Sequence, residues 1–208
     1  MLEIAEINKE KLNEKILLCA SAENAERYKF VLSTTGRPEF LYSTPTMGEE
    51  CTIDLVSKNK KGEIMGYISL FKNLLLKTVS VCIAVGFGKN PIENIVFIKD
   101  LKEVYKRYFL ENPDANIFSF GACEDNPVME SYLKFMDRCE QNGCKINVTR
   151  SINSVITYDN KLHNQISFQI IKDCPNEELL NSNLEEFFYY QQLRKERSIK
   201  WKIIIYYM

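Results

Sequence analysis

Cysteine and histidine often carry nucleophilic or metal chemistry, and this chain has seven cysteines but a single histidine. No C-x-x-C pair occurs and His163 stands alone, so a Cys/His zinc site is not expected. Nothing in the sequence builds a Ser–His–Asp or Cys–His arrangement around His163. We expect buried, reduced thiols, and Cys82, which has apolar neighbours, is expected to serve packing.

Two neighbouring carboxylates, Glu124 and Asp125, follow an apolar run that is typical of a buried strand. A carboxylate at a strand end could take a proton from an attacking nucleophile. Acidic and amide side chains before a proline are also good helix caps, and Asp125 and Asn126 precede Pro127. Both interpretations stay open at this point.

A third chemical candidate is the segment from Phe87 to Asn94, which links a strand to a helix. The free N–H groups at a helix N-terminus bind phosphate, and Lys89 could add a positive charge. The chemistry alone favours an ordinary strand–loop–helix connection. Asn90 is a good cap, and Pro91 suits the first helical position.

The strands that would position these groups are predicted from alternation and β-branched residues. A turn at Lys60–Glu63, with Gly62 suited to positive φ, joins two of them. Within 51–57, Ile53 and Leu55 face inward while Thr52 and Asp54 face outward. The predicted strands cover 2–7, 51–57, 64–72, 78–87, 116–123, 145–157 and 163–171.

The helices are predicted from apolar residues at helical spacing. One runs from Asn8 to Leu18 and a second covers 22–32. A long amphipathic helix begins at Pro91 and ends near Pro113, and another begins at Pro127 and ends at Asn142–Gly143. The resulting order is β-αα-βββ-α-β-α-ββ, which indicates an α/β (α+β) domain with a mixed central sheet flanked by helices.

This order of elements resembles that of the GNAT acetyltransferase superfamily. Gly62–Leu70 looks like the family's G-E-I-x-G strand, and 78–85 looks like its central strand. The segment from Cys123 to Pro127, with Tyr132 and Lys134 after it, is similar to the family's N-x-x-A…Y-x-K pattern. The resemblance covers roughly 1–172, which defines the domain, and leaves 173–208 as a C-terminal helical and β extension.

The resemblance implies an N-acetyltransferase that uses acetyl-CoA to acetylate a primary amine, either a small molecule or a protein lysine. It implies a splayed central strand whose backbone pairs with pantetheine at Ile83, Ala84 and Val85, with an oxyanion-stabilising N–H near Ile83 or Ala84. It further implies cofactor contacts by Gly88, Lys89, Asn90 and Asn126. Tyr132 would act as the acid that protonates the leaving thiolate, and Glu124 would be the base.

Departures from the family pattern keep an alternative function open. The phosphate loop has one glycine, Gly88, and a proline, Pro91, and Met136–Asp137 stands where the family has G-F. The central strand also carries no carboxylate. A chain that kept the fold without holding the cofactor would be a non-catalytic binding or assembly module. Loss of a thermal shift with acetyl-CoA would distinguish this module from the enzyme.

Composition excludes some other classes. Lys and Arg number 27 against 28 Asp and Glu, so nothing indicates a nucleic-acid footprint. No apolar run approaches the ~20 residues that cross a bilayer, and no secretory leader is visible, so we expect no membrane partner and a cytoplasmic location. The apolar end at 203–207 predicts that the extension packs on the domain or forms a homodimer.

Overall fold

In the computed structural model the strands form one seven-stranded sheet of order β1-β2-β3-β4-β5-β7-β6. The structure describes residues 1–4, 9–19, 24, 28, 52–90, 92–157 and 161–173. Several predicted features lie outside these residues: most of the second helix over 22–32, Pro91, the turn after 157, and the extension from 174 onward. The boundary between domain and extension stays a prediction.

The observed elements confirm the predicted order within the described part of the chain. The helices are α1 (Lys9–Cys19), α2 (Ile95–Tyr105), which a π-helical turn continues over Lys106–Leu110, and α3 (Met129–Gln141). Gly62 and Gly143 have the positive φ expected at a hairpin turn and after a helix. The strands are β1 (Leu2–Ile4), β2 (Thr52–Lys58), β3 (Ile64–Asn73), β4 (Thr78–Gly86), β5 (Ile117–Cys123), β6 (Lys145–Ile156) and β7 (Leu162–Ile171).

The predicted start of the long helix at Pro91 is wrong, because α2 begins at Ile95. Asn90 does act as a cap, but it caps the turn that lies between it and α2, because its Oδ1 accepts the N–H of Glu93 at 3.0 Å. Asn94, immediately before the helix, uses its side chain on Gly88 instead. Asn90 was expected to cap the long helix, but its cap forms in the turn before α2, which begins at Ile95.

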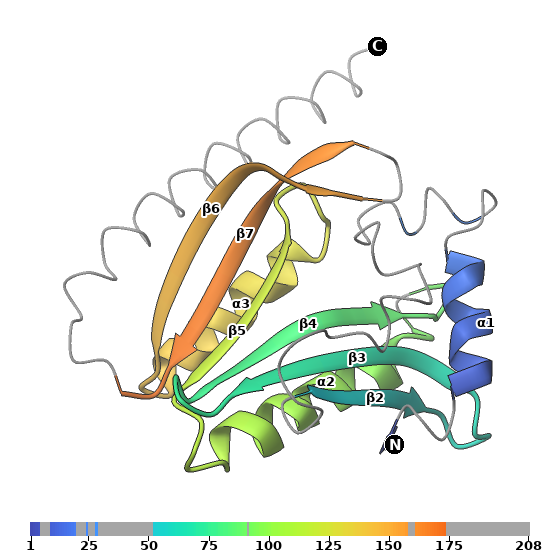
Figure 1. Cartoon of the computed structure of the whole chain (residues 1–208), viewed down its shortest axis with the longest axis horizontal. Coiled ribbons are helices and arrows are strands. Elements are labelled where there is room, and N and C mark those ends of the chain that lie inside the picture. The colour runs from blue at the N-terminus through green and yellow to red at the C-terminus, as the bar shows by residue number, and fades with distance from the viewer. Residues whose placement is uncertain are drawn as a thin grey trace.

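The sheet divides at β4 and β5, which are parallel neighbours for three residue pairs only, ending at Ser80↔Ser119. Beyond that pair β4 continues along β3 to Gly86, and β5 continues along β7 to Cys123. Figure 1 shows the two arms opening as a V, with β1–β4 in one arm and β5, β7 and β6 in the other. This agrees with the splayed central strand expected from the sequence, with the separation beginning after Ser80.

Helices cover the first arm on both faces, which explains why β2 buries consecutive residues, Leu55 and Val56. On one face α1 packs Leu12 and Ile16 into a cluster with Val56, Ile64 and Tyr67. On the opposite face α2 supplies Phe97 and Val104 to a cluster with Leu55, Ile68 and Leu70. The face predicted to point outward is thus the α1 face, and Asp54 belongs to it.

The second arm packs against α3, whose buried residues are Met129, Met136 and Cys139. They join the largest core cluster, which also holds Ile146, Ile166, Phe168 and Ile170. Of the four cysteines whose side chains the structure describes, three are buried as expected, namely Cys123, Cys139 and Cys144. Cys82 is exposed, which corrects its predicted packing role. It lies just beyond the point where β4 leaves β5.

Glycines at the registered pair Gly66↔Gly86 let the start of α2 approach the sheet. A Cβ at Gly66 would lie 2.1 Å from Cδ2 of Phe97, and one at Gly86 would lie 2.7 Å from Oδ1 of Asn94. A larger side chain at either position would therefore force the Phe97 ring or the Asn94 side chain to shift. Within the described residues, no helix is both long and apolar enough to cross a membrane.

Candidate active site at the mouth of the V

A β-bulge lies in β4 just after the strands separate. Ser69 of β3 faces Ile83 and Leu70 faces Val81, so Cys82 is an extra residue without an opposite partner. A bulge re-aims the local backbone and is frequent beside active sites. The resemblance placed the oxyanion-stabilising N–H near Ile83 or Ala84, which are the residues directly after this bulge.

The three residues predicted to contact pantetheine lie on the free edge of β4. Val85 is buried against Tyr28, Ile83 packs on the α1 cluster, and Ala84 is exposed. Because β4 and β5 form no ladder beyond Ser80, the side of β4 that faces the V carries backbone groups that β5 does not pair. Such an edge can accept the amide groups of an extended ligand.

The predicted phosphate loop is closed by its own side chains. Asn94 Oδ1 accepts the N–H of Gly88 at 2.9 Å, and Glu93 Oε2 accepts the N–H of Lys89 at 2.7 Å. Asn90 donates its side-chain amide to Glu93 Oε1 at 3.0 Å. A carboxylate therefore takes a hydrogen bond that a phosphate would accept, and Glu93 would have to move for an anion to bind there.

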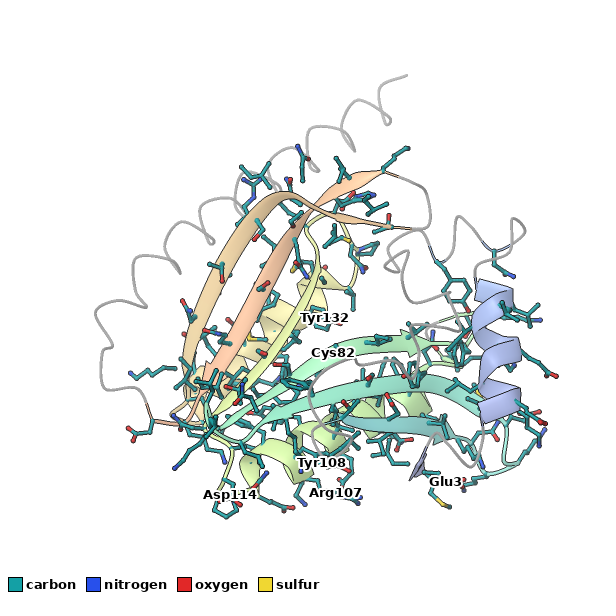
Figure 2. The ribbon with its side chains drawn as sticks, viewed as in Figure 1. Glu3, Cys82, Arg107, Tyr108, Asp114 and Tyr132 are labelled. Carbon is teal, nitrogen blue, oxygen red and sulfur yellow. The ribbon has the colours of Figure 1, made fainter. Side chains whose placement is uncertain are left out.

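Tyr132 lies on α3 and packs edge-on against Phe120 and Phe168, with ring centroids 5.1 and 6.3 Å away. Burial among these neighbours raises the pKa of its phenol above the ordinary value, so the group keeps its proton through neutral pH. Within the described residues its hydroxyl holds no hydrogen bond. Figure 2 labels Tyr132 in the α3 region and Cys82 on the opposite arm of the V.

Glu124, the base expected from the sequence, is held by neighbours. Arg150 donates to both carboxylate oxygens at 2.9–3.1 Å, and Asn164 donates to Oε2 at 2.8 Å. Its side chain is 18% exposed. These contacts tie the end of β5 to β6 and β7 across 26 and 40 residues of sequence, so Glu124 has a structural task here whatever else it does.

A pocket of about 300 Å³ opens at this outer end of the second arm. His163 Nδ1 lies 3.2 Å from each carboxylate oxygen of Asp125, and the His163 side chain is only 11% exposed. Asn126 closes the turn that precedes α3, because its Oδ1 accepts the N–H of Val128 at 3.1 Å, and α3 itself begins at Met129. The pocket is lined by Glu124, Asp125, Asn153, Leu162, His163 and Asn164.

Sequence reasoning missed one carboxylate near the bulge, Asp54 of β2. Tyr67 Oη donates to Asp54 Oδ1 at 2.7 Å, and Tyr67 itself is 1% exposed. The only signal in the sequence was an acidic residue at an outward position of a strand, which ordinarily indicates a solvated face. Strand register, which brings Asp54 level with the bulge, is not visible along the chain.

Solved structures with the same architecture are N-acetyltransferases. Aminoglycoside 6'-acetyltransferase type Ii is 13% identical with a TM-score of 0.52, over 84% of this chain and 98% of that one. Spermidine N-acetyltransferase from Vibrio cholerae, in complex with CoA and spermine, is 12% identical with a TM-score of 0.53, over 83% and 95%. Ribosomal-protein-alanine N-acetyltransferase from Brucella melitensis is 12% identical with a TM-score of 0.50, over 82% and 99%.

These likenesses assign the fold: the described chain has the architecture of the GNAT acetyltransferases. No protein-family model and no curated protein matches the sequence. At 12–13% identity the fold is what these structures share with this chain, and residue roles have to be argued from its own geometry.

Proposed function

We propose that this protein is an acetyl-CoA-dependent N-acetyltransferase that acetylates a primary amine. The observation that carries the proposal is the opening of β4 from β5 after Ser80↔Ser119, with a bulge at Cys82 in the exposed edge. Within the described residues, that edge offers a pantetheine arm backbone groups that β5 does not pair. The GNAT architecture supports the choice, and one structure of similar fold holds CoA and spermine.

The chain's own residues divide the work as follows. Backbone groups of Ile83, Ala84 and Val85 would hold the thioester arm, and an N–H after the bulge would stabilise the oxyanion. Lys89 and the turn at Gly88–Asn90 would meet the diphosphate once Glu93 moves aside. Tyr132, whose phenol keeps its proton, would donate to the leaving thiolate.

The test begins with acetyl-CoA binding by the full chain. We expect a concentration-dependent rise in Tm, followed by release of free thiol when an amine panel is added. Lys89→Ala should weaken binding by about two- to fivefold, the range for one exposed charge contact. Lys61→Ala, in the Lys60–Glu63 turn, is the matched control and should bind as the wild type does.

One observation favours the alternative, a non-catalytic module. The loop N–H groups of Gly88 and Lys89 already bond to Asn94 and Glu93. If acetyl-CoA gives no rise in Tm and no amine releases thiol, the enzyme proposal is wrong and the module remains. Deletion of 174–208 would then test whether the extension mediates assembly. If it does, the molecular mass of the protein in solution should fall by more than the mass of the deleted residues.

A further inference from the structure

Three strands place Asp54 in line with the β4 bulge. Asp54 of β2 is registered with Ser69 of β3, and Ser69 is registered with Ile83 of β4. Directly opposite residues of antiparallel strands share one face of the sheet. At about 4.8 Å per strand, Asp54 and Ile83 therefore belong to strands about 10 Å apart. The small side chain of Ser69 is all that the intervening strand places between them.

Asp54 is oriented by a rigid neighbour. Tyr67 Oη donates to its Oδ1 at 2.7 Å, and the Tyr67 ring is fixed in the cluster formed by α1, Val56 and Ile64. Within the described residues the other carboxylate oxygen, Oδ2, holds no hydrogen bond. Asp54 as a whole is half-buried, so the described residues do not enclose its carboxylate. Tyr67 therefore orients the carboxylate through Oδ1, and Oδ2 has no described partner.

The charge of Asp54 reaches the bulge. The Cys82 thiol has a raised pKa, first because of desolvation and second because of the Asp54 carboxylate. β4 itself, Thr78–Gly86, contains no acidic residue. Both carboxylate oxygens of Glu124, at the end of the other arm, already accept hydrogen bonds from Arg150 and Asn164. Among the described residues, Asp54 is therefore the carboxylate best placed to act on a group bound beside the bulge.

We propose that Asp54 receives the acceptor's ammonium group and takes its proton, directly or through one water, before the amine attacks. The inference rests on the proposed acetyl transfer. The ammonium loses a proton to Asp54, and the free amine nitrogen bonds to the thioester carbon. The C–S bond breaks, the sulfur takes the electron pair, and Tyr132 protonates the thiolate. One of the two protons left on the nitrogen returns to Tyr132 through water, the other stays on the amide, and the proton on Asp54 passes to solvent. The products are an N-acetyl amine and the free thiol of CoA.

The first test compares Asp54→Asn, which keeps the shape and Tyr67 contact, with Asp114→Asn, an exposed turn residue. We expect Asp54→Asn to lower kcat/KM by at least about 100-fold, the scale of general base catalysis, with the acetyl-CoA rise in Tm unchanged. Asp114→Asn should match the wild type. In Asp54→Gly, added formate should restore part of the rate, because a free carboxylate can occupy the vacated place.

A second readout does not depend on turnover. Removing the Asp54 charge lowers the Cys82 pKa, so more thiolate is present at a given pH. Iodoacetamide should therefore modify the Cys82 peptide faster in Asp54→Asn than in the wild type at pH 8, as followed by mass spectrometry. Asp114→Asn should leave that rate unchanged.

The outcomes separate the two proposals. The role of Asp54 is overturned if the wild type is active, the kcat/KM of Asp54→Asn stays within threefold of it, and formate does not rescue Asp54→Gly. That result leaves the acetyltransferase proposal intact. A 100-fold loss in Glu124→Gln alongside a normal Asp54→Asn would assign the proton to Glu124 instead. Wild type that releases no thiol with any amine overturns the enzyme proposal and this inference with it.

Discussion

The hydroxyls of Ser80 and Ser119 lie 2.7 Å apart at the last residue pair shared by β4 and β5. The two strands are paired up to this hydrogen bond and separate beyond it. Both side chains are half-buried, so each serine would lose a polar partner if the other were removed. The pair therefore closes the vertex of the V from which the proposed site opens (Figure 1).

The serine pair predicts a coupled effect on stability. Ser80→Ala or Ser119→Ala alone should lower the free energy of unfolding by about 0.5–1.5 kcal/mol, because the remaining hydroxyl loses its partner. The double variant should cost less than the sum of the two. Urea unfolding of the four proteins measures the coupling energy. Strictly additive losses would mean that the hydrogen bond contributes nothing.

Glu93 predicts an effect on acetyl-CoA affinity. Its carboxylate accepts the Lys89 N–H at 2.7 Å, in the position proposed for a phosphate. Glu93→Gln removes a negative charge beside the helix N-terminus and should tighten acetyl-CoA binding by about two- to fivefold. Calorimetric titration measures the Kd. Glu63→Gln, in the Lys60–Glu63 turn, is the control that should leave it unchanged, and unchanged affinity in both variants would show that Glu93 does not compete.

Gly66 predicts a packing defect when a side chain is added. A Cβ there would come within 2.1 Å of the Phe97 ring, so Gly66→Ala should destabilise the fold by about 1–3 kcal/mol. The second variant Phe97→Leu, made in the Gly66→Ala background, should recover part of the loss by shortening the clashing ring. Thermal unfolding compares them. If Phe97→Leu recovers no stability, the loss in Gly66→Ala comes from the strand itself and not from a clash with the Phe97 ring.

The protonated phenol of Tyr132 predicts an effect on turnover. Burial raises the pKa of this phenol above its ordinary value, so the group keeps its proton at neutral pH. Tyr132→Phe should lower kcat by about 10- to 100-fold, and the wild-type rate should show no fall from loss of this proton near neutral pH.

The same shift affects stability at alkaline pH. The unfolded tyrosine releases its proton at a lower pH than the folded one, so the folded protein loses stability as pH rises through and beyond the unfolded pKa. Tyr132→Phe should make the alkaline loss smaller, as measured by urea unfolding at pH 9 to 11. Equal losses in both proteins would contradict the burial of the phenol.

Much of the architecture followed from local patterns. Alternation in 64–72 and 78–87 predicted β3 and β4 nearly to the residue, and the Asn142–Gly143 signal predicted the end of α3. These signals are local because turn conformation, capping and side-chain period depend on a few neighbouring residues. The roles of the turn at Gly88–Asn90 and of Tyr132 came instead from the resemblance to the GNAT family, and they stay predictions.

What only the tertiary structure decided depends on pairing between distant segments. Asn90 carries a capping signal, but its side chain caps a turn rather than α2, since Asn94 is drawn to Gly88. The sequence left Glu124 as a candidate base, but in the fold Arg150 of β6 and Asn164 of β7 donate hydrogen bonds to its carboxylate. Asp54 gained its place from the register of β2, β3 and β4, which no single segment specifies, because strand pairing is fixed by contacts remote in sequence.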